Sequence, residues 1–345
     1  MEEMIKQIRS YRGEPIRIME VCGTHTMNIA KYGIKQILPP QVELISGPGC
    51  PVCVTPESFF TTLYDYIHTH HCIVATFGDL LRIPFQNTSL QKERSKGYQV
   101  QIVYSPLECL KIAEEHPDKE IIFLGVGFET TAPLTALLVL KAKEKNLKNL
   151  KVVLSHKSIL PAIRLLLEDK ENNISGLLYP GNVGAIIGSN DFKQISYNYQ
   201  VKGSVCGFRA EEILQSIHFI LYGREIFENH YKKVVVERGN TKALEVMGEV
   251  FKSCDSTWRG LGTIKDSGYQ LQWAYDTYGI EIENRKREGI PEGDKCLCGE
   301  ILKGKKTPID CKYFAKQCTP FSPIGPCMVS SEGTCSAAFL TRKSI

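Results

Sequence analysis

The sequence predicts an α/β protein with two doubly wound parallel-sheet domains, followed by a C-terminal segment of different character. Three observations carry this prediction. Short runs rich in Val and Ile alternate with helix-length amphipathic segments from residue 15 to about 222. The runs are nearly continuous rather than alternating in polarity, as expected for strands buried on both faces of a parallel sheet. Residues 223–345 leave this pattern and end in a block of cysteines.

Strands and helices are expected to follow one another as βαβ units. The predicted strands are Ile16–Val21, Val42–Ser46, Ile73–Phe77, Val100–Tyr104, Ile121–Val126, Val152–Ser155 and Gly176–Tyr179. The predicted helices between and after them are Pro106–His116, Pro133–Lys145, Ser158–Asp169 and Arg209–Tyr222. The first helix has Ser105 as a good N-cap and proline at its first position. A further helix is expected at Thr241–Lys252, with irregular chain after it.

Two stretches carry their own glycine-rich strand ends, which favours two α/β domains of about 100 residues each over one large sheet. We place the first domain, with the CxxC loop, at residues 36–139. The second is discontinuous, at residues 1–35 and 140–222. The third, at residues 223–345, holds most of the cysteines.

Composition excludes several classes of protein. The 345 residues are 43% hydrophobic and 23% charged, which is ordinary for a globular chain and unlike a disordered, coiled-coil or collagen-like one. The net charge of +4, from 42 basic and 38 acidic residues, lacks the basic excess of a nucleic-acid binder. The first ten residues lack the apolar core of a signal peptide, and no run approaches the ~18 apolar residues of a membrane span. We therefore expect a cytoplasmic protein that binds neither nucleic acid nor membrane.

The cysteines are the unusual feature of the composition. In a reducing compartment, 13 cysteines point to metal ligation or redox chemistry rather than to a disulfide scaffold. The last six form the C-terminal block, and they are Cys296, Cys298, Cys311, Cys318, Cys327 and Cys335. Their wide spacing lacks the paired knuckles of zinc sites and favours an iron–sulfur cluster wrapped by loops, with zinc and free thiols as alternatives. Four scattered cysteines are expected to be packing residues, namely Cys72, Cys109, Cys206 and Cys254.

Reactive residues also follow the first two predicted strands. Cys22-Gly-Thr-His-Thr26 comes after the first strand, and ligands bind at the carboxyl ends of strands in open α/β sheets. Cys22 and His25 could hold one metal, His25 could lower the pKa of the Cys22 thiol, or the segment could be a simple turn. Gly47-Pro-Gly-Cys-Pro-Val-Cys53 follows the second strand, and its CxxC is either a redox dithiol with an exposed first thiol or half of a zinc knuckle.

The fifth predicted strand ends in Gly125-Val-Gly-Phe-Glu-Thr-Thr-Ala-Pro133. This stretch is similar to a phosphate-binding loop, but Thr130 replaces the third glycine of that motif. A helix N-terminus after the glycines could still hold an anion or a polar ligand. Glu129 is therefore interpreted as either a capping carboxylate or a site residue.

Together these motifs resemble one family, HypD, the iron–sulfur scaffold proteins of [NiFe]-hydrogenase maturation. The resemblance rests on Cys22–Thr26, Gly47–Cys53, Gly127–Pro133 and the terminal block with Gly325-Pro-Cys-Met-Val-Ser-Ser-Glu-Gly-Thr-Cys335, and it covers nearly the whole chain. It implies two α/β domains and an iron–sulfur domain. It also implies a [4Fe-4S] cluster held by the set Cys296, Cys311, Cys318 and Cys335.

The resemblance further implies roles for the remaining cysteines. Cys298 and Cys327 would form a redox pair beside the cluster, as in ferredoxin–thioredoxin reductase, and Cys50 and Cys53 a second dithiol. Cys22, with His25 nearby, would hold iron in a complex with the small protein HypC. HypE would supply cyanide, and the Fe(CN)2(CO) unit would pass to the hydrogenase large subunit. The resemblance thus implies a scaffold or assembly protein with redox activity, and it leaves open whether the chain is itself an enzyme. A cluster-fed thiol–disulfide oxidoreductase and a non-catalytic zinc protein are the competing hypotheses.

Overall fold

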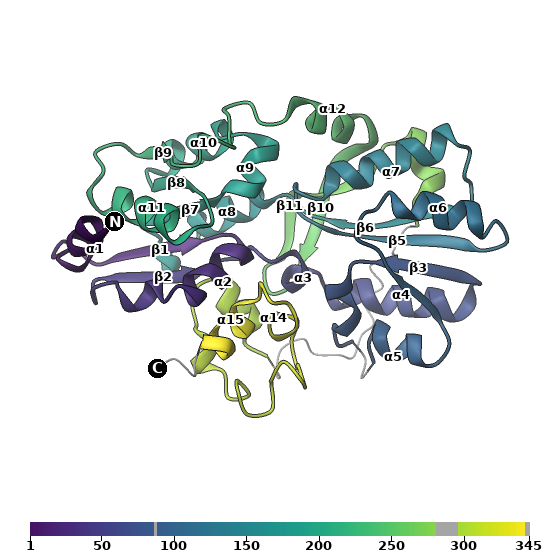
Figure 1. Ribbon diagram of the computed structural model, residues 1–345, viewed down its shortest axis with the longest axis horizontal. Helices are drawn as coiled ribbons and strands as arrows, with labels where there is room; N and C mark the ends of the chain where they lie inside the picture. Colours follow the sequence, from purple (N-terminus) through teal and green to yellow (C-terminus); the bar gives the residue numbers. More distant parts are fainter. Residues whose placement is uncertain (86–87, 281–295, 342–345) are drawn as a thin grey trace.

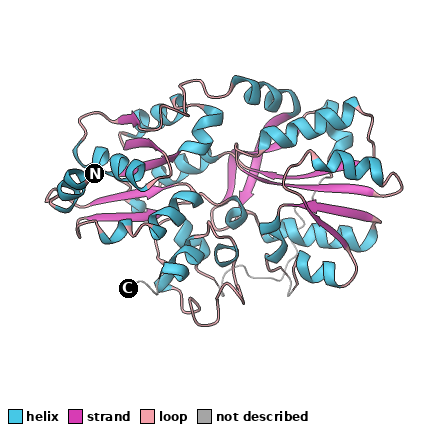
Figure 2. Cartoon of the chain, viewed as in Figure 1, coloured by secondary structure: helices cyan, strands magenta, loops and turns pink. Residues whose placement is uncertain are grey.

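The structure is a computed structural model that describes residues 1–85, 88–280 and 296–341. It confirms the α/β class with two parallel sheets, which we call sheet A and sheet B (Figure 1). The sheets lie side by side, and helices flank both (Figure 2). No helix within the described ranges is long and apolar enough to cross a membrane.

Sheet A has five parallel strands in the order β2-β1-β7-β8-β9. They are β1 (Ile16–Glu20), β2 (Val42–Ser46), β7 (Gly176–Pro180), β8 (Lys202–Cys206) and β9 (Phe227–Asn229). The direction of winding reverses between β1 and β7, because β2 lies on one side of β1 and the later strands lie on the other. This is the topological switch point, where ligands bind in open α/β sheets.

Sheet B has four parallel strands in the order β4-β3-β5-β6. They are β3 (Cys72–Thr76), β4 (Gln99–Ile102), β5 (Glu120–Gly127) and β6 (Leu150–His156). All seven predicted strands are present in the two sheets, with ends that differ by at most two residues. Strand β8 was not predicted, because its Lys-Gly-Ser-Val-Cys sequence lacks an apolar run.

A third element, an antiparallel hairpin, stands where irregular chain was predicted. It consists of β10 (Phe251–Trp258) and β11 (Gly262–Leu271) and follows α12 (Thr241–Val250), which confirms the predicted helix there. Two isolated β-bridges connect this region to β6, the edge strand of sheet B. One joins Lys157 to Gly268 of the hairpin, and the other joins Val152 to Gly279, which follows the hairpin. Only the two end residues of β10, Phe251 and Trp258, are buried, so the strand carries no hydrophobic pattern that the sequence could show.

Helices cover both faces of each sheet (Figure 2). The helices before the hairpin, other than α12, are α1 (Glu2–Arg9), α2 (Gly23–Lys31), α3 (Pro51–Val54), α4 (Glu57–Thr69), α5 (Leu90–Ser95), α6 (Glu108–Glu115), α7 (Ala132–Glu144), α8 (Ile159–Glu168), α9 (Gly181–Ile187), α10 (Asn190–Tyr199) and α11 (Ala210–Tyr222). The C-terminal helices are short, namely α13 (Cys298–Leu302), α14 (Pro326–Val329) and α15 (Thr334–Thr341). The 3-10 turns are η1 (Ile34–Gln36), η2 (Gly78–Arg82), η3 (Lys170–Asn172), η4 (Trp273–Tyr278) and η5 (Pro308–Asp310).

The sheets divide the chain at other points than the predicted boundaries of 36–139 and of 1–35 with 140–222. Strand β2 and the CxxC loop after it belong with β1 in sheet A, and β6 belongs with β5 in sheet B. Sheet B is therefore built from residues 72–156, and sheet A from the segments on either side. The reason is long-range pairing, which the local pattern of each strand does not encode. How far each sheet forms a domain of its own remains a prediction.

One hydrophobic core joins the sheets to the cysteine block. It runs from Met19 and Ile45 in sheet A to Ile122 and Leu124 in sheet B. The same core contains Cys50, Cys53, Cys298, Cys318, Cys327 and Cys335. Packing between the elements thus brings the N-terminal and C-terminal cysteines to one place.

Candidate functional site

The loops that follow β1, β2 and β7 meet at the switch point of sheet A. They carry Cys22, the Cys50–Cys53 loop and Asn182 respectively. The cysteine block covers them from outside, because α15 packs on α2 and α14 packs on α3. Figure 1 shows this C-terminal segment, in yellow, directly beside α2 and α3.

Cys22 is the N-cap residue of α2 and is 4% exposed. Its amide donates to Glu20 Oε2 at 3.1 Å, and its Sγ lies 3.7 Å from Asn182 Oδ1. Burial raises the pKa of the thiol to about 12, and the charges of Glu332 and Glu20 act in the same direction. The amides of His25 and Thr24 oppose this shift. The thiol is therefore neutral at pH 7, and it would become a thiolate only when a metal displaces the proton.

His25 follows three residues later on the first turn of α2, on the same side of the helix as Cys22. Its ring is fully buried, stacks on Phe208 at 4.8 Å and bonds through Nε2 to the Gly207 carbonyl at 2.8 Å. Burial lowers the pKa of His25 to about 4, although the carbonyls of Gly207 and Cys206 act against the shift. A neutral ring that donates from Nε2 keeps a lone pair on Nδ1. That atom has no hydrogen-bond partner among the described residues, so it is free to bind a metal.

The glycines of the second motif allow the two strand-end loops to touch. The Gly23 amide donates to the Gly49 carbonyl at 3.0 Å, and the Gly47 amide donates to the Glu20 carbonyl at 2.7 Å. A side chain at position 49 would place its Cβ 2.2 Å from the Cys22 nitrogen. Only glycine fits this contact, which holds Cys22 beside the CxxC loop.

Cys50 and Cys53 form a disulfide with a Cα–Cα distance of 5.3 Å. Cys50 is the N-cap of α3, and its sulfur accepts from the Cys53 amide at 3.2 Å. The two residues are 4% and 0% exposed. An exposed first thiol, as in thioredoxin-like proteins, was one expectation from the motif, and the burial of Cys50 corrects it. The cause is α14, which covers α3.

The cysteine block is tied to the Cys22 motif through Glu332. Thr24 Oγ1 donates to Glu332 Oε1 at 2.6 Å, and a side chain at position 23 would place its Cβ 2.5 Å from the Glu332 Cβ. The close contact at Gly23 explains why glycine follows Cys22. It also means that the block and the Cys22 loop are fitted to one another.

Several cysteines of the block influence one another's pKa through their charges. Burial is the largest cause that raises the pKa of Cys335, and the charges of Cys298, Cys296, Cys318 and Cys311 act in the same direction. Those of Cys296 and Cys311 likewise act on Cys318. Thiolates that raise one another's pKa in this way repel each other unless a cation binds among them, so the donor type fits a thiolate-held cluster. In the described part of the chain, no three His, Cys, Asp or Glu side chains converge as they would on a single metal ion.

Local backbone features also fit sulfur ligands. Cys318 Sγ accepts from the Ile324 amide at 3.4 Å, a contact that tunes iron–sulfur centres. A side chain at position 325 would lie 2.7 Å from Cys296 Sγ. Cys311 is partly exposed, whereas Cys318 and Cys335 are buried. The four residues Cys296, Cys311, Cys318 and Cys335 are thus the ones that could hold a [4Fe-4S] cluster.

Cys298 and Cys327 form a buried pair, and Cys298 also shares a side-chain hydrogen bond with Cys296. Cys298 and Cys327 share a side-chain hydrogen bond and are 3% and 1% exposed. Cys327 lies on α14, the helix that packs on α3 and the Cys50–Cys53 disulfide. The pair therefore stands between the predicted cluster ligands and the disulfide.

The switch point of sheet B has a different character. Glu129 is buried, and its Oε1 accepts from Ser158 Oγ and from the Ile159 amide, both at 2.9 Å. Glu129 is therefore a capping carboxylate, but it caps α8 rather than the helix α7 that follows it. Burial is the main cause that raises the pKa of Glu129, to about 7.

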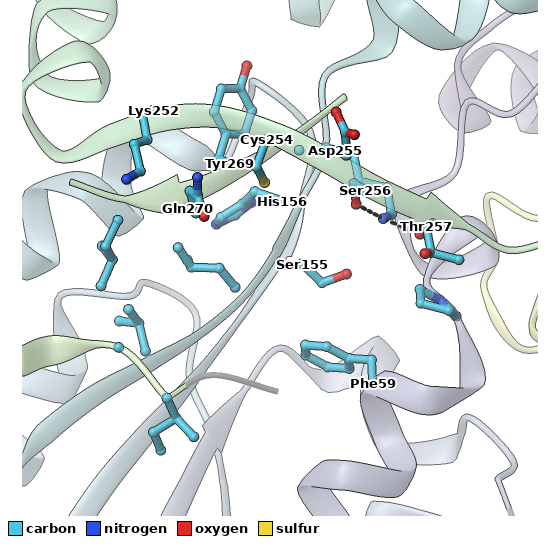
Figure 3. Close-up of a pocket in the computed structure, with 18 of the residues that line it drawn as sticks. Phe59, Ser155, His156, Lys252, Cys254, Asp255, Ser256, Thr257, Tyr269 and Gln270 are labelled. Atoms are coloured by element: carbon cyan, nitrogen blue, oxygen red, sulfur yellow. Dashed lines mark hydrogen bonds between the residues drawn. The ribbon is translucent and has the colours of Figure 1, made fainter. Parts of the chain in front are cut away.

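A pocket of about 500 Å³ opens between β6 and the hairpin (Figure 3). Figure 3 shows His156 and Gln270 near its centre, with Phe59 on the opposite wall. Lys157 Nζ donates to Ser256 Oγ and to the Thr257 carbonyl, both at 2.8 Å, which anchors the hairpin to sheet B. Burial lowers the pKa of Lys157 to about 7. No predicted site residue lines this pocket.

Sequence reasoning missed several polar neighbours of the site. Glu20 and Asn182 lie beside Cys22, and Glu332 joins it from the cysteine block. Asn182 stands in a glycine turn directly after a predicted strand, which was a usable signal. Glu332 could be placed only by the tertiary fold. Among the scattered cysteines, Cys109 and Cys206 are buried as expected, while Cys72 and Cys254 are partly exposed.

Comparison with known proteins adds independent findings. A family model described as "HypD: Hydrogenase formation hypA family" matches residues 1–342. The chain is 38% identical over 341 residues to hydrogenase maturation factor HypD of Escherichia coli (strain K12), covering 97% of this chain and 91% of that protein. It is 37% identical over 341 residues to the HypD of Rhodobacter capsulatus, covering 96% and 90%. It is 38% identical over 334 residues to hydrogenase expression/formation protein HupD of Azotobacter chroococcum, covering 93% and 88%.

Proposed function

This chain belongs to the HypD family, and from that premise we propose that it is a hydrogenase maturation scaffold on which, together with HypC, the Fe(CN)2(CO) unit of [NiFe]-hydrogenase is assembled. Cys22 is the residue that holds the iron, with His25 as a second donor. HypE delivers the cyanide, and the finished unit passes to the hydrogenase large subunit. The cytoplasm is the expected location, because 11 of the cysteines are free thiols.

One observation carries this proposal. At the switch point of sheet A, a buried thiol and a buried imidazole with a free Nδ1 lie on the same turn of α2. A thiolate is a soft ligand and suits a ferrous iron that carries cyanide. The iron is cargo, and its binding would release the Cys22 proton, since the thiol is neutral in the free protein.

Redox support comes from the neighbouring cysteines. A [4Fe-4S] cluster held by Cys296, Cys311, Cys318 and Cys335 would supply single electrons to this region. Cys298 and Cys327 would exchange with the Cys50–Cys53 disulfide, and the packing of α14 on α3 supports this step. In that exchange two thiols become a disulfide while the other disulfide becomes two thiols, so electrons and protons balance.

A free-standing thiol–disulfide oxidoreductase is the alternative. Such an enzyme must present a thiol to a separate protein substrate. The burial of Cys50, Cys53, Cys298 and Cys327 gives such a substrate no access, and it favours the scaffold.

The test is infrared spectroscopy of the protein co-purified anaerobically with HypC. Wild type should show cyanide and carbonyl bands, and Cys22→Ala should lose them while keeping the iron and acid-labile sulfide of the cluster. Cys254→Ala is the matched control, because it removes a thiol on the hairpin, and it should keep the bands. Retention of the bands in Cys22→Ala would contradict the role of Cys22. Zinc without acid-labile sulfide in the wild type would contradict the cluster.

A further inference from the structure

The positive charge of the chain is concentrated in one short segment of the cysteine block. Residues 303–316 hold five lysines and one aspartate, a net charge of +4, which equals the net charge of the whole chain. All other residues together therefore carry no formal net charge. The aspartate, Asp310, accepts from the Thr307 amide at 2.7 Å and from its hydroxyl at 2.9 Å, so its carboxylate caps η5. Such a local excess of one sign attracts partners of the opposite charge to that part of the surface.

Two of the five lysines are neutralised by carboxylates, and three are not. Lys303 pairs with Glu300 at 3.0 Å, and Lys305 lies 2.8 Å from Asp169 and 2.7 Å from Glu171. The other three are exposed and form no ion pair with any residue that the structure describes, and they are Lys306, Lys312 and Lys316. Their charges are therefore directed at solvent and available to a partner.

Exposed apolar side chains stand in and beside the same segment. Ile309 is 83% exposed, and Phe321, on the turn after Cys318, is 97% exposed. Among the large hydrophobic residues of the described ranges, only Tyr104 and Trp273 are exposed to a similar degree. Large apolar side chains in full contact with water are costly, and together with a charged surround they are typical of surfaces that bind other proteins.

Consecutive turns fold this part of the chain around Cys311. The Cys311 amide donates to the Pro308 carbonyl at 3.1 Å, and the Phe314 amide donates to the Cys311 carbonyl at 2.9 Å. The Cys318 amide then donates to the Tyr313 carbonyl at 2.9 Å. Cys311 is itself partly exposed, and Figure 1 shows the whole segment at the outer margin of the molecule. The exposed side chains before and after it are what we call the Cys311 surface, namely Lys306, Ile309, Lys312, Lys316 and Phe321.

We propose that the Cys311 surface is the docking site of an acidic one-electron carrier protein of the ferredoxin type, which reduces the cluster held by Cys311 and its partners. This inference rests on the proposed function for the cluster and adds the class of its electron donor. One electron leaves the reduced carrier and enters the oxidised cluster, and no bond forms or breaks. The lysines attract and orient the acidic carrier, and the apolar side chains supply the close contact. A plant-type ferredoxin, at about −400 mV, is reducing enough for this step.

The first test measures binding alone, by isothermal titration calorimetry of the anaerobically purified protein with an oxidised plant-type [2Fe-2S] ferredoxin. Lys312→Glu should weaken binding about tenfold, and higher ionic strength should weaken binding to wild type. Lys316→Glu should act in the same way at a position further from Cys311. Lys242→Glu is the matched control, because Lys242 is an exposed lysine of α12, which lies on the opposite side of the molecule from the block in Figure 1, and it should bind like wild type.

The second test measures electron transfer, by stopped-flow mixing with the reduced ferredoxin at low ionic strength. Lys312→Glu should slow reduction of the cluster about tenfold at unchanged iron and sulfide content. Reduction by photoreduced 5-deazariboflavin, a small uncharged reductant that needs no docking site, should keep its wild-type rate. Ile309→Gln removes apolar contact and keeps every charge, so it should weaken ferredoxin binding without changing its salt dependence.

Several results would overturn the docking proposal. They are the absence of ferredoxin binding by wild type, an equal loss in Lys242→Glu, and equal affinity for a single-stranded DNA oligonucleotide, which would mark a general polyanion site. Absence of iron and acid-labile sulfide in the wild type would instead refute the proposed cluster. The calorimetric measurement needs no cluster, so it still decides on the Cys311 surface in that case.

Discussion

The carboxyl edges of the two sheets share a topology and differ in chemistry. In each sheet the winding reverses beside a central strand pair, β1 and β7 in sheet A and β3 and β5 in sheet B. Each edge carries one buried carboxylate and one buried imidazole, Glu20 with His25 and Glu129 with His156. The same two residue types therefore occupy comparable positions in both halves.

Hydrogen bonding separates the two edges. His156 bonds through Nε2 to Thr135 Oγ1 at 2.8 Å and approaches Thr131 Oγ1 through Nδ1 at 3.4 Å, so its ring belongs to the packing of α7. His25 has a partner for one ring nitrogen, Nε2, and the other, Nδ1, has no hydrogen-bond partner among the described residues. Each edge keeps one buried polar atom without a hydrogen-bond partner among the described residues, Nδ1 of His25 in sheet A and Oε2 of Glu129 in sheet B. The edge of sheet A also carries the buried thiol of Cys22, so its donor set is the one that suits a soft metal.

The largest expected effect comes from replacing a glycine with alanine at the carboxyl edge of sheet A. Gly49→Ala places a Cβ 2.2 Å from the Cys22 nitrogen, and those neighbours are backbone atoms that cannot rotate away. We expect a loss of at least about 3 kcal/mol in unfolding free energy, at the upper end for overpacking, together with loss of the cyanide and carbonyl bands. Denaturant unfolding and infrared spectroscopy measure the two effects.

Gly78→Ala is the matched substitution at the edge of sheet B. The nearest atom to its Cβ would be Ile102 Cγ2 at 3.8 Å, an ordinary contact. We expect no loss of stability, or a gain of about 0.4–1 kcal/mol from reduced chain entropy in the unfolded state. Equal destabilisation by the two alanines would show that the close contact at Cys22 is not special.

The sequence predicted the strands that are buried and continuous, and it failed for those that are not. Strand β7 is buried at all five positions, and its apolar run is visible in the sequence. Strand β10 is buried only at Phe251 and Trp258, so nothing in its residues separates it from irregular chain. The assignment of β2 and β6 to their sheets also escaped prediction, because it depends on pairing between distant segments.

Those residues of the site that belong to a recognisable cysteine motif could be predicted from the sequence. Cys22, the CxxC loop and the C-terminal block could be found because cysteine is rare and its spacing is informative. Their mutual burial could not, since it depends on α14 and α15 packing on α3 and α2.

The pH dependence of stability is the next way to compare the edges. The pKa values of Glu20 and Glu129 are raised to about 7, mainly by burial, and those of His25 and His156 are lowered to about 4 by the same cause. Because the folded state holds these two protons more tightly than the unfolded state, the carboxyls contribute to the unfolding free energy fully below about pH 4.5. This contribution is lost as the pH rises towards 7. The imidazoles favour folding above about pH 6.5, and theirs is lost as the pH falls towards 4.

Replacing one carboxyl removes its pH-dependent loss of stability, so the opposite pH dependence of the imidazoles should become visible. In Glu129→Gln, stability relative to wild type should increase from pH 4.5 to 7, by at most about 3 kcal/mol at 1.36 kcal/mol per pKa unit. Urea unfolding at several pH values measures this difference. Glu20→Gln should give the same trend from the other edge. Glu115→Gln, an exposed carboxylate, should follow wild type at every pH, and a constant offset for Glu129→Gln would contradict the prediction.

The smallest effect should come from two hydroxyls that donate to buried or half-buried carboxylates, one at each edge. Thr24 Oγ1 donates to Glu332 at 2.6 Å, and Ser158 Oγ donates to Glu129 at 2.9 Å. Thr24→Val and Ser158→Ala should each lower the unfolding free energy by about 1–2 kcal/mol, as expected for hydrogen bonds to charged groups. Their consequences for Cys22 should differ, because of these two hydroxyls only that of Thr24 bonds α2 to the cysteine block. Alkylation of Cys22 by N-ethylmaleimide, followed by mass spectrometry, should be faster in Thr24→Val and unchanged in Ser158→Ala. Faster alkylation in both variants would mean that general loosening of the fold, rather than the cover over sheet A, controls access to the thiol.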